Sequence, residues 1–549
     1  MGPTTLTCSL ACALAAAAPG QQRVDFLRSG ASTFVAARAA ATAGDARRAA
    51  MLYASLAAAD PGDRLAARRA VGQAILAGDM PLAVRLAQRQ PKAELAVDAR
   101  LLLIGDALRK GRIDQEVGAE FPQQLDFMAP FVGAWTLAER RRLPEALKLL
   151  DGVQASSPLS QFVPEHKALI LLAAGRGAEA EPLFTRALAA ARGRANRLRI
   201  AFATGLVAQG NREGGLALLA GRDVTLRGAA THLATERRPR LPIATAAEGL
   251  SELVVALAVG LDEGDSGTLP LGLAQVARHA DPRNEQAALL AGLLLDRSGR
   301  GDDGIAVFRT LPDKSPFLTE ARDAETRILL RASRPQEALA RAKAFVADDR
   351  AGAADWLRLG DVLEAMKKYD EAAVAYGGAA AAVQAGGPGP ELWSIHLLRG
   401  AALEQGGKWP QAESALELAY KLAPDNPAVL NYLGYARLER GEQLDEAEAL
   451  IAEASRRAPD DASITDSLGW AQYKRGKVAD AILTLQRAAA ADPAQSEIHE
   501  HLGDALYAAG RKYEARFAWQ AALVTAEDDV RQRVQNKIGA GLSAATAAP

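Results

Sequence analysis

The sequence predicts an all-α superhelical solenoid of about 12–13 stacked helix–turn–helix repeats. Small residues recur with a period of about 34 residues, which is typical of units made of two helices. No run of alternating apolar and polar residues between turn signals indicates a strand, so we expect almost no sheet. The period is plainest near the C-terminus, where the recurrent glycines are Gly400, Gly434, Gly469 and Gly503 and the alanines that follow them are Ala412, Ala447, Ala481 and Ala515.

Each recurrent residue has a packing reason. The small residues lie where two antiparallel helices and the first helix of the next unit approach closely, and a larger side chain would overpack the contact at about 1–3 kcal/mol. Proline closes the second helix because it lacks the amide proton. Glycine ends the first helix because only glycine adopts positive φ freely; the positions are Gly407, Gly441, Gly476 and Gly510.

One unit near the C-terminus carries most of the recurrent residues, at Leu468-Gly469, Ala481, Leu485, Ala488 and Pro493. This pattern resembles the tetratricopeptide repeat, whose recurrent residues are Trp, Leu-Gly, Tyr, Ala, Phe, Ala and Pro. The resemblance covers contiguous units from Trp393 to about Asp529, and the frame extends upstream with decreasing fidelity. It implies paired helices that wind into a superhelix with a concave groove.

The repeat frame divides the chain into segments of different regularity. The polar residues of the last helix suit a terminal cap, which a solenoid needs for solubility. Two interpretations of the middle stay open: two arrays with an irregular segment between them, or one continuous superhelix with loop insertions. We expect a signal peptide at 1–20, a degenerate array at 21–229, an irregular helical connector at 230–284, repeats at 285–386, a Gly/Pro loop at 387–392, regular repeats at 393–529, and a capping helix with a disordered tail at 530–549.

The first residues have the pattern of an export signal. Residues 1–19 carry no charge, and the small and apolar run from Cys8 to Ala18 suits a secretory signal core and is too short to span a bilayer. Ser9 to Cys12 loosely resembles a lipoprotein processing box, so one alternative is a lipid anchor at Cys12. Because no basic residue precedes the run, the other alternative is a frayed first helix of a cytosolic protein.

The sequence offers no catalytic or metal-binding pattern. Its six histidines are scattered and have no metal-ligand spacing, and no glycine-rich phosphate loop or GxSxG motif occurs. The 65 basic and 66 acidic residues balance, so no basic stripe indicates nucleic-acid binding. We therefore predict no enzyme activity, no cofactor, no metal and no nucleic-acid partner. The alternative is a repeat-bearing glycan-modifying enzyme with its active site in 230–284.

A groove for another protein is the functional surface that the repeats imply. In this family the first helices line the groove, through positions 2, 5, 9, 12 and 13 of each unit when the glycine of Leu-Gly is position 8. Aromatic residues on an exposed wall are typical binding anchors, although the aromatic residues here can instead pack between repeats. Acidic residues at positions 5 and 9 argue against a clamp for a carboxylate. The groove candidates are Asn431, Tyr435, Asp466, Trp470, Tyr473, Lys474, Glu500, Asp504 and Tyr507.

Four short strings point to one branch of bacterial repeat proteins: NYLGY (431–435), DEAEALI (445–451), DSLGW (466–470) and HLGD (501–504). They are similar to envelope lipoproteins that act as adaptors of carboxyl-terminal processing proteases. The resemblance implies a non-enzymatic scaffold that binds a protein or an extended peptide in the periplasm or at the outer membrane. Membrane association would come only from an N-terminal lipid anchor. The alternative is a cytosolic assembly or regulatory adaptor.

Overall fold

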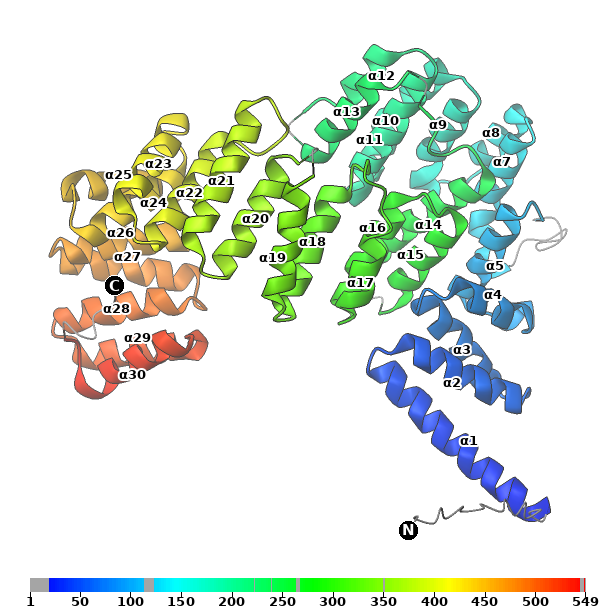
Figure 1. Cartoon of the computed structure of the whole chain (residues 1–549), viewed down its shortest axis with the longest axis horizontal. Helices are drawn as coiled ribbons and strands as arrows, with labels where there is room; N and C mark the ends of the chain where they lie inside the picture. The colour runs from blue at the N-terminus through cyan, green and yellow to red at the C-terminus, as the bar shows by residue number, and fades with distance from the viewer. Residues whose placement is uncertain are drawn as a thin grey trace, which may run out of the picture. The chain divides into compact units, whose positions relative to one another are not determined.

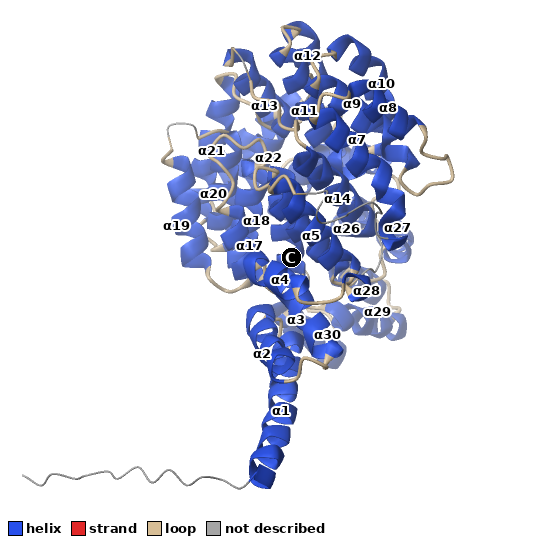
Figure 2. Ribbon diagram, turned by 90° about the vertical axis from the view of Figure 1, so that its right-hand side faces the viewer, coloured by secondary structure: helices blue, strands red, loops and turns tan. Residues whose placement is uncertain are grey.

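The chain folds into two compact helical units. Unit 1 spans Met1–Ala332 and unit 2 spans Ser333–Pro549. Among the described residues every regular element is a helix and no strand occurs, as predicted (Figure 2). Residues 1–18 of the predicted signal peptide, and 544–547 and 549 of the predicted tail, lie outside the described residues. The computed structural model describes residues 19–112, 123–221, 223–237, 239–262, 267–348, 351–543 and 548.

In unit 1, most successive helices pack against one another along the chain. Short 3-10 turns occur at Lys92–Glu94, Gln123–Met128, Ser160–Phe162 and Arg192–Arg194. The α-helices are α1 (Pro19–Thr42), α2 (Ala46–Ala59), α3 (Arg64–Leu76), α4 (Met80–Gln88), α5 (Val97–Arg109), α7 (Ala129–Glu139), α8 (Leu143–Asp151), α9 (Val163–Ala173), α10 (Gly177–Ala190), α11 (Ala195–Ala208), α12 (Arg212–Leu218), α13 (Val224–Thr235), α14 (Ala246–Asp262), α15 (Leu269–Ala280), α16 (Glu285–Arg297), α17 (Gly301–Phe308) and α18 (Leu318–Arg331).

Aspartates begin three early helices of unit 1. Asp45, Asp63 and Asp79 each precede a helix, and each carboxylate accepts a hydrogen bond from the backbone N–H three residues later. Such a cap satisfies one of the amides that the first helical turn leaves unpaired, and it typically contributes about 1 kcal/mol. These caps fix where α2, α3 and α4 begin in a part of the chain where the repeat pattern is weak.

The segment predicted as an irregular connector contributes to the core of unit 1. Leu253, Val254 and Val255 of α14 are at most 1% exposed. Gly249 lies so close to Trp135 that an added Cβ atom would be 2.4 Å from its indole ring. Ser251 donates a hydrogen bond to the carbonyl oxygen of Ala277 on α15, at 2.9 Å. Helix α14 is therefore packed on several sides, against α7, α5 and α15.

Unit 2 is a stack of helix pairs that follow one another from α20 to α29, drawn from yellow-green to red in Figure 1. Each pair has a first and a second helix, and α30 follows the last pair. The helices are α19 (Pro335–Val346), α20 (Ala353–Ala365), α21 (Tyr369–Gln384), α22 (Leu392–Gln405), α23 (Trp409–Leu422), α24 (Pro427–Arg440), α25 (Leu444–Arg457), α26 (Ala462–Lys474), α27 (Val478–Ala491), α28 (Ser496–Ala508), α29 (Lys512–Thr525) and α30 (Asp528–Ala540).

The small residues of the repeat lie in the helix–helix seams, as predicted. A Cβ atom added to Gly469 would lie 2.6 Å from Cγ of Leu485, and one added to Gly503 would lie 2.3 Å from the Trp519 ring. Contacts this short force the neighbouring side chain to move, so only glycine permits this separation of the two helices. The alanines of the second helices are 0% exposed; they are Ala412, Ala447, Ala481 and Ala515.

The glycines predicted to end the first helices all have left-handed backbones. Their φ angles are 73° at Gly407, 68° at Gly441, 77° at Gly476 and 79° at Gly510. Residues with a Cβ atom rarely adopt this region. Gln443, also left-handed with φ 45°, lies in the turn after Gly441, which is one residue longer than the turns after Gly407, Gly476 and Gly510.

Candidate functional site

A cavity of about 280 Å³ opens on the first helices of successive pairs in unit 2. We call it the acidic cavity. Helices α22, α24, α26 and α28, with the turn before α28, supply its wall, so the site runs along the face that the repeat frame predicted as the groove. Its lining residues are Glu404, Asn431, Tyr432, Tyr435, Ala436, Glu439, Ser463, Asp466, Ser467, Gln495 and Glu497.

Three predicted groove residues meet in the acidic cavity: Asn431, Tyr435 and Asp466. The Oδ1 atom of Asn431 is buried and has no hydrogen-bond partner among the described residues. Burial raises the pKa of the half-buried Tyr435, and the carboxylates of Glu439, Glu497 and Asp466 raise it further. These three carboxylates line the same cavity as the phenol, and the tyrosine stays protonated at any physiological pH.

The carboxylates of the cavity are held by residues from behind it. Glu404 accepts a hydrogen bond from Arg440 at 2.8 Å, and Glu439 accepts one from Nε1 of Trp470 at 2.9 Å. Glu497 is exposed and forms no ion pair within the part of the chain that the structure describes. The wall thus keeps a negative charge that its own lining does not neutralise.

Trp470 is placed in the core and presents no surface to a partner. Its side chain is 0% exposed. The indole is stacked against Tyr473 and His501, with ring centroids 4.9 Å and 4.1 Å away. Lys474 lies over the same indole at 5.1 Å and approaches Glu439 at 3.6 Å. For Trp470 the alternative interpretation, packing between repeats, therefore describes the structure, and the residue supports the cavity from behind.

Glu500 and Asp504 are likewise covered, in this case by α30. They are 1% and 0% exposed. Lys537, itself fully buried, contacts both carboxylates at 2.7 Å, and Arg533 binds Glu500 through two nitrogen atoms. Burial opposes ionisation of Glu500, but the hydrogen bonds from Arg533 and Lys537 lower its pKa overall. In contrast, burial raises the pKa of Asp504 despite the same lysine. These two residues bind the chain's own helix and are not open to a partner.

Tyr507 occupies a half-buried position at the end of the array. Its ring lies 5.5 Å from that of Trp519, and the Lys512 ammonium lies 5.3 Å from its centroid. A Cβ atom at Gly541 would come within 2.3 Å of its hydroxyl oxygen, so the chain after α30 passes over it. Tyr507 is therefore separated from the acidic cavity by its own packing, and its role in partner binding stays a prediction.

The repeat frame could have found more of this site than the groove candidates include. Ser463 and Glu497 occupy position 2 of their units, and Glu404 occupies position 12, both of which are groove positions. Tyr432 and Gln495 lie outside those positions. They nevertheless line the cavity, and nothing in the period indicates this.

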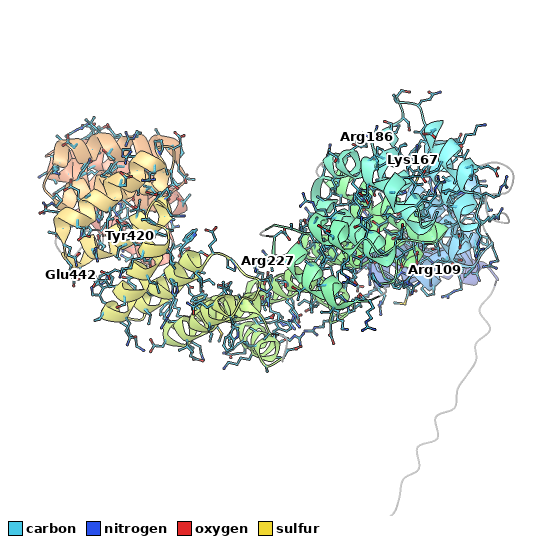
Figure 3. The ribbon with its side chains drawn as sticks, turned by 90° about the horizontal axis from the view of Figure 1, so that it is seen from above. Arg109, Lys167, Arg186, Arg227, Tyr420 and Glu442 are labelled. Carbon is cyan, nitrogen blue, oxygen red and sulfur yellow. The ribbon has the colours of Figure 1, made fainter. Side chains whose placement is uncertain are left out.

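Unit 1 has a cavity of opposite character, of about 660 Å³. Arg109, labelled in Figure 3, lines it together with Arg278 and His279. Arg109 donates a hydrogen bond to the carbonyl oxygen of His279 at 2.7 Å. Burial lowers the pKa of Arg278, whose guanidinium donates to Gln275 at 2.9 Å. The charged residues that line these two cavities thus differ in their prevailing sign.

The described residues contain neither a metal-binding cluster nor a membrane-spanning helix. No cluster of three or more His, Cys, Asp or Glu side chains within them could hold a metal ion. Within the same part of the chain, no helix has the length and apolar character needed to cross a membrane.

The fold defines a class, helical-repeat proteins built from stacked helix pairs, and in unit 2 the first helices of these pairs form the wall of a cavity. Sequence models described as tetratricopeptide repeat match residues 324–390, 403–468 and 467–529. The chain therefore carries tetratricopeptide repeats in these regions, as the resemblance predicted. Scaffolds of this family are typically non-catalytic and bind protein or peptide partners. No curated protein matches the chain.

Several solved structures are similar to the chain at low sequence identity. A structure of the APC/C hetero-tetramer Cut9–Hcn1 is 14% identical over 94% of this chain and 96% of that one, with a TM-score of 0.36. Yeast Tom70 is 10% identical over 94% and 96%, with a TM-score of 0.38. A tetratricopeptide repeat protein from Parabacteroides merdae is 14% identical over 46% and 96%, with a TM-score of 0.38.

Proposed function

We propose that the protein is a non-enzymatic scaffold that binds an extended segment of a partner protein across the first helices of unit 2. The acidic cavity carries this proposal, because it lies on the face predicted as the groove and its wall contains a buried acceptor that no described residue satisfies. This acceptor is the Oδ1 atom of Asn431. An unpaired buried acceptor costs about 1–3 kcal/mol, and a ligand that donates a hydrogen bond would recover part of it.

We further propose that this scaffold is an adaptor of a carboxyl-terminal processing protease in the bacterial envelope. The strings NYLGY, DSLGW and HLGD support it, and all three lie on helices that line the acidic cavity. Fractionation of cells that express the full chain tests the compartment. A product in the periplasmic or outer-membrane fraction supports an envelope adaptor. A product in the cytoplasm contradicts the envelope location and favours the cytosolic adaptor.

Photo-crosslinking tests the scaffold function itself. We would place p-benzoylphenylalanine at Ser463, an exposed residue of the cavity rim, in the full-length chain. The matched control is Leu483, which is 68% exposed on α27, a second helix outside the cavity. Trp470 is unsuitable as a crosslinking position because it is buried.

We expect a defined protein to crosslink from position 463 and not from 483, and mass spectrometry then identifies it. Equal labelling from both positions would indicate contact that does not depend on the groove. Crosslinks from 483 alone would mean that the partner binds the second helices, and the groove assignment would be wrong.

A further inference from the structure

The acidic cavity has a one-sided charge. Four of its lining residues are carboxylates, Glu404, Glu439, Asp466 and Glu497, and none is Lys, Arg or His. Arg440, Lys474 and His501 contact three of these carboxylates from outside the lining, and Glu497 forms no ion pair with a described residue. An ionised carboxylate offers about four acceptor positions in all, so one contact from behind leaves acceptors that can face the cavity.

The remaining lining suits the stem of a cationic side chain. Tyr432 and Tyr435 supply two aromatic rings, and Ala436 adds an apolar contact. Lysine and arginine pack their methylene stems on such surfaces and keep the charged end at polar groups, and a cation near a tyrosine face gains about 0.5–2 kcal/mol. The cavity of about 280 Å³ has room for one long side chain and not for a folded element.

An independent observation points to a hydrogen-bond donor as the ligand. The Oδ1 atom of Asn431 is buried in this wall and accepts no hydrogen bond from the described residues. Tyr435 lines the same cavity as the four carboxylates. An ammonium or a guanidinium is a donor without an acceptor, so it can satisfy Asn431 and neutralise the carboxylates together.

We propose that the acidic cavity binds a lysine or arginine side chain of the partner segment. This inference rests on the proposed scaffold function and names the chemistry that the groove selects. A carboxylate or phosphate is disfavoured, because it would bring a like charge beside four carboxylates.

Fluorescence anisotropy with the full-length chain tests the proposal. The probes are fluorescein-labelled hexa-arginine and hexa-citrulline, which are nearly the same in shape, but citrulline has no charge. The test variant is the double substitution Glu439→Gln and Glu497→Gln. Glutamine at 439 can still accept from Trp470, and Glu497 is exposed, so neither change removes a packing contact. The matched control is Asp480→Asn, an exposed carboxylate on α27 outside the cavity.

We expect hexa-arginine to bind the unmodified chain at least about tenfold more tightly than hexa-citrulline, since a charged hydrogen bond contributes about 1.5–3 kcal/mol. The double variant should lose most of this difference, and Asp480→Asn should keep it. Equal binding of the two probes to the unmodified chain overturns the proposal. Unchanged hexa-arginine binding by the double variant also overturns it, because the peptide then binds elsewhere.

The two proposals fail in different ways. If a partner crosslinks from position 463 but the probes bind equally, the scaffold function stands and the cationic preference is wrong. If the probes discriminate and the double variant abolishes the difference while no protein crosslinks, the cation site stands without the scaffold function. Should the double variant not fold, Glu497→Gln alone gives the same comparison at an exposed position.

Discussion

The Nδ1 atom of His501 lies 2.9 Å from Oδ2 of Asp466, and both side chains are buried between α28 and α26. Burial opposes a charge on the imidazole, but the Asp466 carboxylate outweighs it and raises the pKa of His501 above its usual 6.5. The ring also stacks on Trp470. The two neighbouring repeats are therefore joined by a buried histidine–aspartate pair directly behind the acidic cavity.

This pair predicts that unit 2 loses stability as the pH rises. The folded state binds the His501 proton more tightly than the unfolded chain, so the stabilisation is complete below about pH 6.5. It decreases from there as the pH rises through the higher pKa of the folded state. Hydrogen exchange of α26 and α28 at several pH values, corrected for intrinsic rates, measures it. His501→Gln should flatten the dependence, and an identical slope in that variant would contradict the assignment.

A buried histidine in unit 1 predicts the opposite dependence. Nε1 of Trp135 donates to Nδ1 of His166 at 2.9 Å, so this nitrogen is an acceptor and the ring is neutral. Burial, together with the nearby Arg194 charge, lowers the pKa of His166 from 6.5 to about 3. The stabilisation is therefore present above about pH 6.5 and is lost as the pH falls towards 3.

The loss should reach about 1.4 kcal/mol for each pH unit well below 6.5, which is the free energy of one pKa unit. Hydrogen exchange of α9 between neutral and acidic pH measures it. His166→Gln keeps an acceptor for Trp135 and cannot titrate, so its α9 should be less sensitive to acid. If α9 protection in the unmodified chain did not change with pH, another group would hold the proton.

Two adjacent glycines of α21 predict opposite effects of alanine. A Cβ atom at Gly377 has its nearest neighbour, Arg399, at 3.9 Å, whereas one at Gly378 would lie 2.7 Å from the Trp356 ring. Gly377→Ala should stabilise unit 2 by about 0.5–1 kcal/mol through helix propensity. Gly378→Ala should destabilise it by about 1–3 kcal/mol because the ring must move. Thermal unfolding of both variants gives the signs, and two equal shifts would show that Trp356 adapts freely.

Removal of the buried cation at α30 should be costly. Lys537→Met leaves Glu500 and Asp504 without the ammonium that contacts both, and breaking one side of a buried ion pair typically costs about 3–5 kcal/mol. Hydrogen exchange of α28 and α30 measures the change. Arg511→Gln breaks an exposed pair with Glu514 and should leave both helices unchanged. Full protection of α30 in the lysine variant would mean that apolar packing alone holds it.

The sequence predicted the helix pairs well because their constraints are local to the repeat. Gly469 must be small since Leu485 of the paired helix lies against it, and an equivalent contact recurs in the neighbouring units, as between Gly503 and Trp519. The repeat pattern does not indicate contacts with residues that lie outside the repeats. Lys537 belongs to the terminal helix, which the sequence suggested was polar because it faces solvent, yet its ammonium is buried on Glu500 and Asp504.

The candidate site was predicted in part for the same reason. Asn431, Tyr435 and Asp466 lie in the acidic cavity because groove positions follow from the frame. Trp470 occupies the same position as Tyr435 in the next unit, but its larger indole turns inward, where Glu439 accepts its N–H and His501 stacks on it. Whether an aromatic residue faces the groove or the core depends on its neighbours in the adjacent repeats. The spacing of residues along the sequence gives no information on these neighbours.

Helix α30 has a consequence for self-assembly. A stack of similar repeats that ends in an exposed seam offers copies of itself a matching edge, and head-to-tail addition then leads to open fibres. At this edge another helix pair would pack against Glu500 and Asp504. Arg533 and Lys537 already bind these carboxylates, and the backbone N–H of Ala548 donates a hydrogen bond to Asp504. We therefore expect these contacts to oppose polymer growth from the last repeat, and loss of α30 to remove that protection.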